Sequence, residues 1–298
     1  MNEIAVLDYR LLPDAQNQIQ ALAANEVSFY KGRCLEDEHI RRTGAADIAL
    51  VTPWDKIDIN YLDACQNLKY IGLCGTSTAN IDLGELDKRG IAFSNIVSGD
   101  KESVAEFFFM QLVALTRGTG EHQWKQDEQH ELVGRRLGII GLGAVGKAMA
   151  HMALAYKMDV VYYSPHRKPE WEERGVAYLD KKELLESSDI VVLCSPTNVE
   201  VLGEPEFNIM KFGSILIQAC GGSPFNKPAF YDWIAKEGNF ALFDMSANEQ
   251  NYQAYKDLPR VIFSRLVAGD TYESNERRGK RAIENLQNYL NSQSDQKN

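Results

Sequence analysis

The sequence has few cysteines and no recognisable cysteine motif. Its five cysteines show neither a CxxC pair nor the Cys/His spacing of a metal site, which excludes a disulfide-stapled or zinc-nucleated fold. We expect no metal ion. An odd cysteine count without a signal peptide predicts a reduced, cytoplasmic protein.

Positive charge and long hydrophobic runs are also scarce. The 298 residues contain 32 Lys plus Arg against 42 Asp plus Glu, a net charge of −10. This balance argues against nucleic acid and anionic membranes as partners. The longest apolar stretch, residues 104–115, is interrupted by Glu106 and Gln111 and is too short to span a bilayer.

Short apolar segments alternate with helical patterns along the whole chain. This alternation predicts βαβ units and parallel sheets. Expected strands lie at 4–7, 26–30, 47–52, 70–73, 91–93, 137–140, 160–163, 190–193, 214–217, 240–243 and 261–263. Expected helices lie at 14–24, 36–42, 58–67, 83–89, 102–117, 181–186, 228–236 and 272–290, followed by a frayed polar tail at 291–298.

A glycine-rich turn follows the strand expected at 137–140. Gly141, Gly143 and Gly146 form Gly-x-Gly-x-x-Gly and lead directly into an Ala-rich helical segment. The first glycine permits a tight turn, the second lets a pyrophosphate approach the backbone, and the third lets helix and strand pack closely. The helix N-terminus favours the negative charge of the phosphates, so the turn predicts dinucleotide binding.

Several segments together resemble the D-2-hydroxyacid dehydrogenase family, which includes glycerate, phosphoglycerate and formate dehydrogenases. The matching segments are 68–82, 102–107, 132–141, 191–196, 215–222 and 242–244, in that order along the chain. The resemblance implies two doubly wound parallel α/β domains. A flavodoxin-like substrate domain would comprise 1–96 plus 267–298, and a Rossmann dinucleotide-binding domain 97–266. It also implies a homodimer, for which the apolar helix around Phe107–Val113 is a candidate interface.

The chain departs from the family at the positions that carry its chemistry. The family uses an Arg to bind the substrate carboxylate, a His as acid/base and a Glu that orients the His. The resemblance places Cys220 at the Arg position, Leu266 at the His position and Glu249 at the Glu position. A positioned acid/base contributes about 10²–10⁴ in rate, so ordinary D-2-hydroxyacid dehydrogenase activity is not expected.

Other residues are candidates to replace the missing groups. Arg265 adjoins Leu266, although neighbours on an extended segment point opposite ways. His122 and His130 flank the polar loop around Trp124, which could fold over the active site of a partner subunit. Glu249 is a candidate general base if it is buried. Cys220 is a candidate nucleophile if its pKa is depressed.

The same resemblance places a substrate loop at Cys74, Gly75, Thr76 and Ser77. Here Ser77 and Ala79 replace a Gly and an Asp that are usual in the family.

The coenzyme contacts come partly from spacing and partly from the resemblance. The strand at 160–163 ends at Ser164, with His166 and Arg167 just beyond. A hydroxyl with a guanidinium suits a 2′-phosphate, whereas NAD-binding members place a carboxylate there. We therefore favour NADP over NAD.

The resemblance supplies the remaining coenzyme contacts. It puts Val145 at the phosphates, Cys194 and Pro196 near the adenosine, and Asp244 at the carboxamide. Ala144 and Val201 replace an Arg and a Thr that are often found there.

Two functions follow from these observations. The first is an NAD(P)-dependent oxidoreductase with an atypical active site, acting on a small-molecule 2-keto or 2-hydroxy acid or on another carbonyl or imine. The second is a catalytically silent relative that binds the coenzyme as a sensor, regulator or assembly partner.

Overall fold

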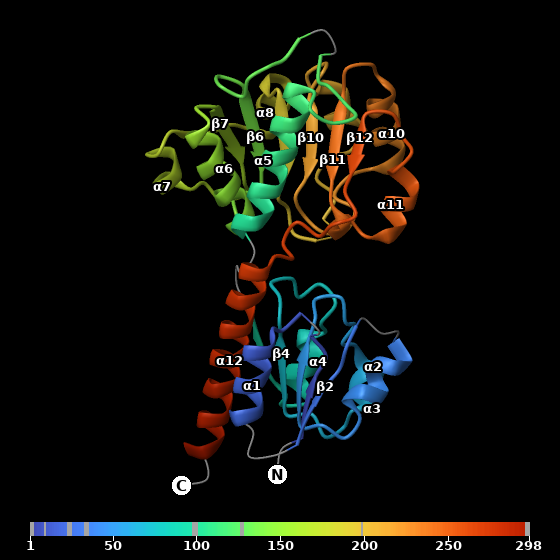
Figure 1. The fold of residues 1–298 in the computed structure, drawn as a ribbon, viewed down its shortest axis with the longest axis vertical. Coiled ribbons are helices and arrows are strands. Elements are labelled where there is room, and N and C mark those ends of the chain that lie inside the picture. Colours follow the sequence, from blue (N-terminus) through green and yellow to red (C-terminus); the bar gives the residue numbers. More distant parts are fainter. Residues whose placement is uncertain are drawn as a thin grey trace. The chain divides into compact units, whose positions relative to one another are not determined.

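The computed structural model describes residues 3–8, 10–22, 26–32, 36–96, 101–125, 128–197 and 199–295. The chain divides into two compact units, 1–99 with 271–298 and 100–270 (Figure 1). The resemblance had predicted boundaries at 96/97 and 266/267. No helix among the described residues is long and apolar enough to cross a membrane.

The first unit is a parallel five-stranded sheet in the order β2-β1-β3-β4-β5, which is the flavodoxin-like order. Its strands are β1 (Ile4–Val6), β2 (Val27–Phe29), β3 (Ile48–Val51), β4 (Tyr70–Leu73) and β5 (Ala92–Asn95). Its helices are α1 (Pro13–Leu22), α2 (Glu36–Thr43), α3 (Ile59–Ala64), α4 (Leu83–Lys88) and α12 (Tyr272–Asp295).

Two apolar clusters cover the two faces of this sheet. Side chains of α1 and α12 pack with Ile4, Val6 and Ile48 on one face, and α12 runs beside α1 in Figure 1. Side chains of α3 and α4 pack with Ala49 and Val51 on the other face. The alternation follows from the two-residue period of a strand.

The second unit is a parallel seven-stranded sheet in the order β12-β11-β10-β9-β6-β7-β8. Its strands are β6 (Arg136–Ile140), β7 (Asp159–Tyr163), β8 (Val176–Tyr178), β9 (Ile190–Leu193), β10 (Ile215–Gln218), β11 (Phe240–Phe243) and β12 (Val261–Phe263). The strand order is that of a Rossmann fold with one added strand, and it reverses between β6 and β9. That reversal is where a dinucleotide binds in such sheets.

Helices cover both faces of the second sheet. They are α5 (Lys101–Arg117), α6 (Ala144–Ala155), α7 (Pro169–Glu172), α8 (Lys181–Ser187), α9 (Glu204–Ile209), α10 (Lys227–Ala235) and α11 (Glu249–Tyr255), with a 3-10 turn η1 (Met245–Ala247). Helices α5 and α6 pack with Leu137 and Ile139. Helices α8, α9 and α10 pack with Ile140 and Leu216 on the opposite face. The predicted pair of doubly wound α/β domains is confirmed.

Some sequence expectations were wrong in detail. The strand β8 and the helices α7, α9 and α11 were not predicted, because they are short and lack a clear apolar period. The polar tail is not frayed up to Asp295, since α12 continues to that residue. The helix expected at 14–24 is α1, which ends at Leu22, and residues 23–25 lie outside the described part of the chain.

Candidate functional site

The glycine turn connects β6 to α6 at the point where the strand order reverses. Gly141 has a φ of +100°, which an L side chain rarely adopts. Its N–H donates to the carbonyl of Tyr163 at 2.8 Å. A Cβ on Gly141 would lie 2.6 Å from the carbonyl oxygen of Cys194. The turn is therefore fitted between the ends of β7 and β9, and only glycine is compatible with it.

The other two glycines differ in the space around them. A Cβ on Gly146 would lie 2.1 Å from the carbonyl oxygen of Gly141, so this residue lets helix and turn pack together. A Cβ on Gly143 would meet nothing within 4 Å, and Gly143 caps α6 without any side-chain hydrogen bond to the helix N–H groups. Open space before uncapped N–H groups suits a pyrophosphate. Val145 follows, half-buried against the core.

The end of β7 carries the residues predicted for coenzyme choice. Ser164 is half-buried, whereas His166 and Arg167 are exposed. The Arg167 guanidinium lies 5.0 Å from the Tyr178 ring and donates through Nε to Glu172 Oε1 at 3.1 Å. A second hydrogen bond joins Arg167 Nη2 to the other Glu172 oxygen.

Glu172 is a residue that the sequence reasoning missed. Its Oε1 also accepts the Tyr162 hydroxyl at 2.9 Å, and the Arg167 guanidinium lowers the pKa of this carboxyl. Arg167, which was predicted to bind a 2′-phosphate together with Ser164, is therefore paired with the carboxylate of Glu172 from α7. Arg167 and Glu172 are five residues apart, which is not a helical pairing distance, so the sequence held no signal for the contact.

The segment after β9 contains two of the predicted adenosine contacts. Cys194 is partly buried and packs on the core, while Pro196 is exposed. Between them, Ser195 Oγ lies 3.6 Å from Cys220 Sγ, at the end of the neighbouring strand β10. Burial raises the pKa of the Cys194 thiol well above its ordinary value.

The surroundings of Cys220 do not favour a thiolate. Burial raises the pKa of its thiol to about 11, although hydrogen bonding from Ser195 acts in the opposite direction. The thiolate is the reactive form, so this shift works against the nucleophilic role of Cys220, which stays a prediction. Cys220 also carries no charge with which to bind a carboxylate.

Two buried amides fix the loop that follows Cys220. Gln218 Nε2 donates to the carbonyls of Cys220 at 3.0 Å and Gly222 at 2.9 Å. Asn251 Nδ2 donates to Gly222 at 3.1 Å and to Ala247 at 2.8 Å. Both amides are fully enclosed in the unit. They hold the loop between β10 and α10 against η1 and α11.

Asp244 ends β11 and is buried. Its Oδ2 accepts the Ala268 N–H at 2.7 Å, its Oδ1 accepts the Ser246 N–H at 3.2 Å, and Ser246 Oγ is a third partner. Burial raises the pKa of this carboxyl, against the effect of these hydrogen bonds. The carboxylate thus orders the two segments on either side of it. Its predicted contact with a carboxamide stays a prediction.

The positions predicted for the family's His and Glu lie on neighbouring segments. Leu266 has a 67% exposed side chain, and its carbonyl accepts the Met245 N–H at 3.0 Å. Glu249 begins α11, is exposed, and accepts a hydrogen bond from Gln253 at 2.7 Å. The burial on which a general-base role for Glu249 depended is absent within this unit, and that role stays a prediction.

Arg265 does not lie on an extended segment. Strand β12 ends at Phe263, and the chain then bends, with Ser264 Oγ accepting the Leu266 N–H at 3.1 Å. The argument that Arg265 and Leu266 must point to opposite sides was therefore wrong. Arg265 is exposed, and its guanidinium carbon lies 5.3 Å from the centre of the Tyr252 ring.

The substrate loop predicted in the first unit follows β4. Cys74 is buried, and its carbonyl accepts Arg10 Nη2 at 2.9 Å. Arg10 also holds Asp8 through two hydrogen bonds of 2.7 and 2.6 Å. Gly75 packs so closely on Pro53 that a Cβ would lie 2.0 Å from its ring. Burial raises the pKa of the Cys74 thiol strongly, as expected for a packing residue.

The other two loop residues are more open. Thr76 is exposed, and its carbonyl accepts the Asn95 amide at 3.2 Å. Ser77 is half-buried and accepts the Ala79 N–H at 3.4 Å. Each of these hydrogen bonds joins a side chain to a backbone group of the loop.

The two candidate histidines lie at the polar loop after α5. His130 is 3.4 Å from Arg135 and packs edge-on against Trp124, with ring centres 5.5 Å apart. His122 lies edge-on to Phe240, whose N–H pairs with Ser214 at the amino end of the sheet. The glycine turn lies at the carboxyl ends of the strands, on the opposite side of the sheet from these loops. Neither histidine is therefore near the glycine turn of the same unit.

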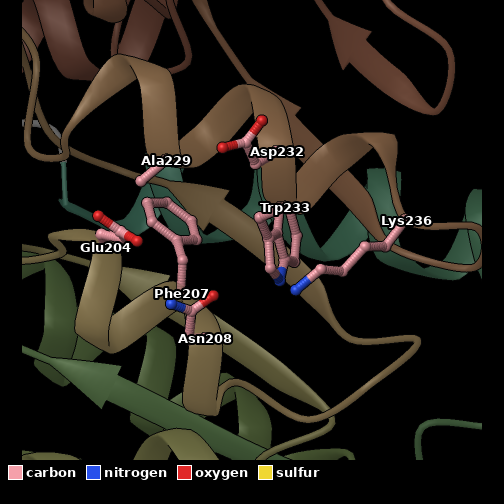
Figure 2. Close-up of a pocket in the computed structure, with 7 residues that line it drawn as sticks. All are labelled: Glu204, Phe207, Asn208, Ala229, Asp232, Trp233 and Lys236. Atoms are coloured by element: carbon pink, nitrogen blue, oxygen red, sulfur yellow. The ribbon is translucent and has the colours of Figure 1, made fainter.

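A small hollow lies between α9 and α10 (Figure 2). Buried Phe207 and Trp233 line it together with exposed Glu204, Asp232 and Lys236. Its volume of about 40 Å³ suits one or a few water molecules rather than a substrate. No cluster of three or more potential metal ligands occurs among the residues that the structure describes.

Comparison with known proteins indicates the same class of protein as the fold, a dehydrogenase with a dinucleotide-binding domain. The family model described as D-isomer specific 2-hydroxyacid dehydrogenase, NAD binding domain, matches residues 108–268. A glyoxylate reductase from Thermococcus litoralis is 32% identical over 273 residues, covering 84% of this chain and 81% of that protein. The chain therefore belongs to the D-isomer specific 2-hydroxyacid dehydrogenase family.

Two solved structures are similar over almost the whole chain. An acyclic imino acid reductase, Bsp5, in complex with NADPH and D-Arg has a TM-score of 0.82 at 26% identity, with 97% of each chain covered. A 3-phosphoglycerate dehydrogenase from Entamoeba histolytica with bound NAD⁺ has a TM-score of 0.83 at 20% identity, with 97% and 95% covered. The second likeness concerns the fold alone.

The residues present fit a nicotinamide coenzyme. The uncapped start of α6 and the open space at Gly143 leave room for a pyrophosphate. The exposed Arg167 lies at the end of β7, where the adenosine ribose binds in Rossmann folds. Membership of the family and these two features together support an oxidoreductase that binds a nicotinamide coenzyme.

Proposed function

We propose that the chain is an NAD(P)-dependent reductase whose substrate is an imine formed from a 2-oxo acid and an amine. The observation that carries this proposal is the exposed Leu266 at the position predicted for the family's acid/base. A leucine neither gives nor takes a proton, so the reaction must not require a proton donor there.

Imine chemistry meets that requirement. When a carbonyl is reduced, its oxygen gains negative charge and must take a proton, for which a positioned acid contributes about 10²–10⁴-fold. A protonated imine already carries that proton on nitrogen. Transfer of a hydride to its carbon breaks the C=N π bond and leaves a neutral amine. The bound coenzyme, when reduced, supplies this hydride.

The charges of the predicted site also suit a cation. Replacing an Arg and a His by Cys220 and Leu266 leaves two uncharged side chains, which do not repel an iminium ion. Glu249 adds an exposed carboxylate at the start of α11. The acyclic imino acid reductase that the chain resembles supports this choice of substrate.

We further propose that NADP is preferred over NAD. Arg167 has a 62% exposed side chain with N–H groups beyond those bonded to Glu172. A guanidinium binds a phosphate through several parallel hydrogen bonds. Glu172 opposes this preference by its charge and supports it by holding Arg167 in place.

The protein is also expected to form a homodimer through α5. Most of its large side chains belong to the core, but Met110 is 61% exposed. Light scattering of the purified protein gives the mass that tests this expectation.

The first experiment titrates the protein with NADPH and NADH by nicotinamide fluorescence. The second follows oxidation of the bound coenzyme with glyoxylate or pyruvate, each with and without methylamine. We expect micromolar binding with NADPH preferred, and turnover only when the amine is present.

The other outcomes separate the alternatives. Fast reduction of the oxo acid alone would overturn the proposal and restore the ordinary family reaction. Coenzyme binding without turnover of either mixture would favour a catalytically silent sensor or regulator. Binding of neither coenzyme would mean that the glycine turn persists only as part of the fold.

A further inference from the structure

Arg265 is held in place by a column of aromatic rings. Its guanidinium lies over Tyr252, whose ring meets Phe263 edge-on with centres 5.2 Å apart. Phe263 in turn stacks on Phe243 of β11, also at 5.2 Å. Phe243 is fully buried in the core. The cation therefore rests on a support that is continuous with the interior of the unit.

The N–H groups of Arg265 are uncommitted in the part of the chain that the structure describes. Two other arginines of the same unit are engaged: Arg167 binds Glu172, and Arg260 donates to the carbonyls of Asn239 and Ile234. Arg265 forms no ion pair and no hydrogen bond with a described side chain or carbonyl. A guanidinium that rests on an aromatic ring keeps its in-plane N–H groups for a planar anion.

The position of Arg265 ties it to the predicted site. It directly precedes Leu266, and Tyr252 lies one turn after Glu249 on α11, so the two share a face of that helix. The bend at 264–267 is fixed by Ser264 and by the hydrogen bond from Met245 to Leu266. The bend that carries Arg265 and Leu266 thus meets, through the contact of Arg265 with Tyr252, the helix that begins with Glu249.

We infer that Arg265, supported by Tyr252, binds the carboxylate of a 2-imino or 2-oxo acid and replaces the arginine that is missing at Cys220. A guanidinium pairs with a carboxylate through two parallel N–H···O bonds, which fix orientation as well as position. The inference rests on the proposed function for the nature of the substrate. It restricts that substrate to acids with a free carboxylate beside the reacting carbon.

The test compares two substrates in steady-state kinetics with NADPH: the imine from pyruvate and methylamine, and the carboxylate-free imine from acetone and methylamine. For Arg265→Gln we expect KM for the pyruvate imine to rise about 30–100-fold, as for loss of two charge-assisted hydrogen bonds to a carboxylate. The acetone imine is expected to be a poor substrate of both proteins, and the variant should change its kcat/KM much less than that for the pyruvate imine.

Four further variants sharpen the comparison. Arg265→Lys should recover part of the affinity, since it keeps the charge but not the fork. Tyr252→Phe keeps the ring and should leave KM within about 2-fold, whereas Tyr252→Leu should raise it about 10-fold. Arg135→Gln is the matched control, because Arg135 also lies over an aromatic ring, Trp124, at 5.2 Å, but at the amino end of β6.

Binding of oxamate to protein saturated with NADPH gives a readout that does not need turnover. Weaker oxamate binding by Arg265→Gln without any turnover would overturn the proposed reaction and keep the role of Arg265. Unchanged KM and unchanged oxamate binding in Arg265→Gln would overturn the role of Arg265 alone. Absence of both turnover and oxamate binding in the unmodified protein would overturn both.

Discussion

The glycine turn between β6 and α6 and the segments carrying Cys220 and Leu266 belong to the same sheet but differ in what they retain. The turn keeps each glycine that a dinucleotide fold requires, with a reason visible in the contacts of each. In the other segments, Cys220 and Leu266 stand where the resemblance predicts an arginine and a histidine. The contacts of the turn thus account for each of its glycines, whereas the chemistry at Cys220 and Leu266 is a proposal.

The largest effect is expected when the turn itself is damaged. Gly146→Ala places a Cβ 2.1 Å from the carbonyl oxygen of Gly141, and backbone must move to relieve the clash. We expect a loss of about 3 kcal/mol in the free energy of unfolding and a Tm lower by about 10 °C. Thermal unfolding followed by circular dichroism measures it, and an unchanged Tm would contradict the close packing of helix and turn.

The neighbouring glycine separates binding from folding. Gly143→Ala and Gly143→Val add side chains where no atom lies within 4 Å, at a φ of −83° that any residue adopts. The Tm should stay within about 2 °C, because nothing is displaced. NADPH affinity should fall about 10-fold for Ala and 100-fold for Val, since both occupy the expected path of the pyrophosphate. Fluorescence titration checks this, and undiminished affinity would place the phosphates elsewhere.

The next prediction concerns the reactivity of the Cys220 thiol, in one of the segments where the resemblance predicts a different residue. With a pKa of about 11, only about one thiol in a thousand is ionised at pH 8. Alkylation by iodoacetamide should therefore be slow at pH 8 and speed up about 10-fold per pH unit up to pH 10. Mass spectrometry of the peptide containing Cys220 follows it, with Cys220→Ser as control. A rate that levels off near pH 7 would mean an activated thiol.

The smallest effect concerns coenzyme choice. Glu172→Gln removes a negative charge beside Arg167 while keeping an acceptor for its Nε. We expect the NADPH-to-NADH affinity ratio to rise about 5–10-fold, since one nearby charge pair is changed at a partly exposed site. Arg167→Gln should lower the same ratio. Ratios that move together in both variants would exclude Arg167 as the group that distinguishes the coenzymes.

The sequence indicated much of the fold because the relevant signals are local. A strand such as 190–193 is recognisable from four consecutive apolar residues, and the turn at Gly141 from the spacing of its glycines. The short helix α11 was missed, although it carries both Glu249 and Tyr252. Its boundaries depend on Asn248, which caps it with a φ of 78°, and not on an apolar repeat.

The candidate site was less accessible to sequence reasoning. Its residues were located by resemblance, but their surroundings were not. The partial burial of Cys220 and the exposure of Glu249 depend on which neighbouring segments cover each side chain, which residue type and spacing do not specify.

The sequence by itself determined the two parallel α/β units and the glycine spacing of the turn, and it places a cysteine and a leucine where the resemblance predicts an arginine and a histidine. These properties follow from residue type and spacing along the chain. Only the tertiary structure decided that Glu172 holds Arg167 and that Tyr252 supports Arg265. Such contacts join residues from different elements, and they form only when the sheet brings the ends of its strands together.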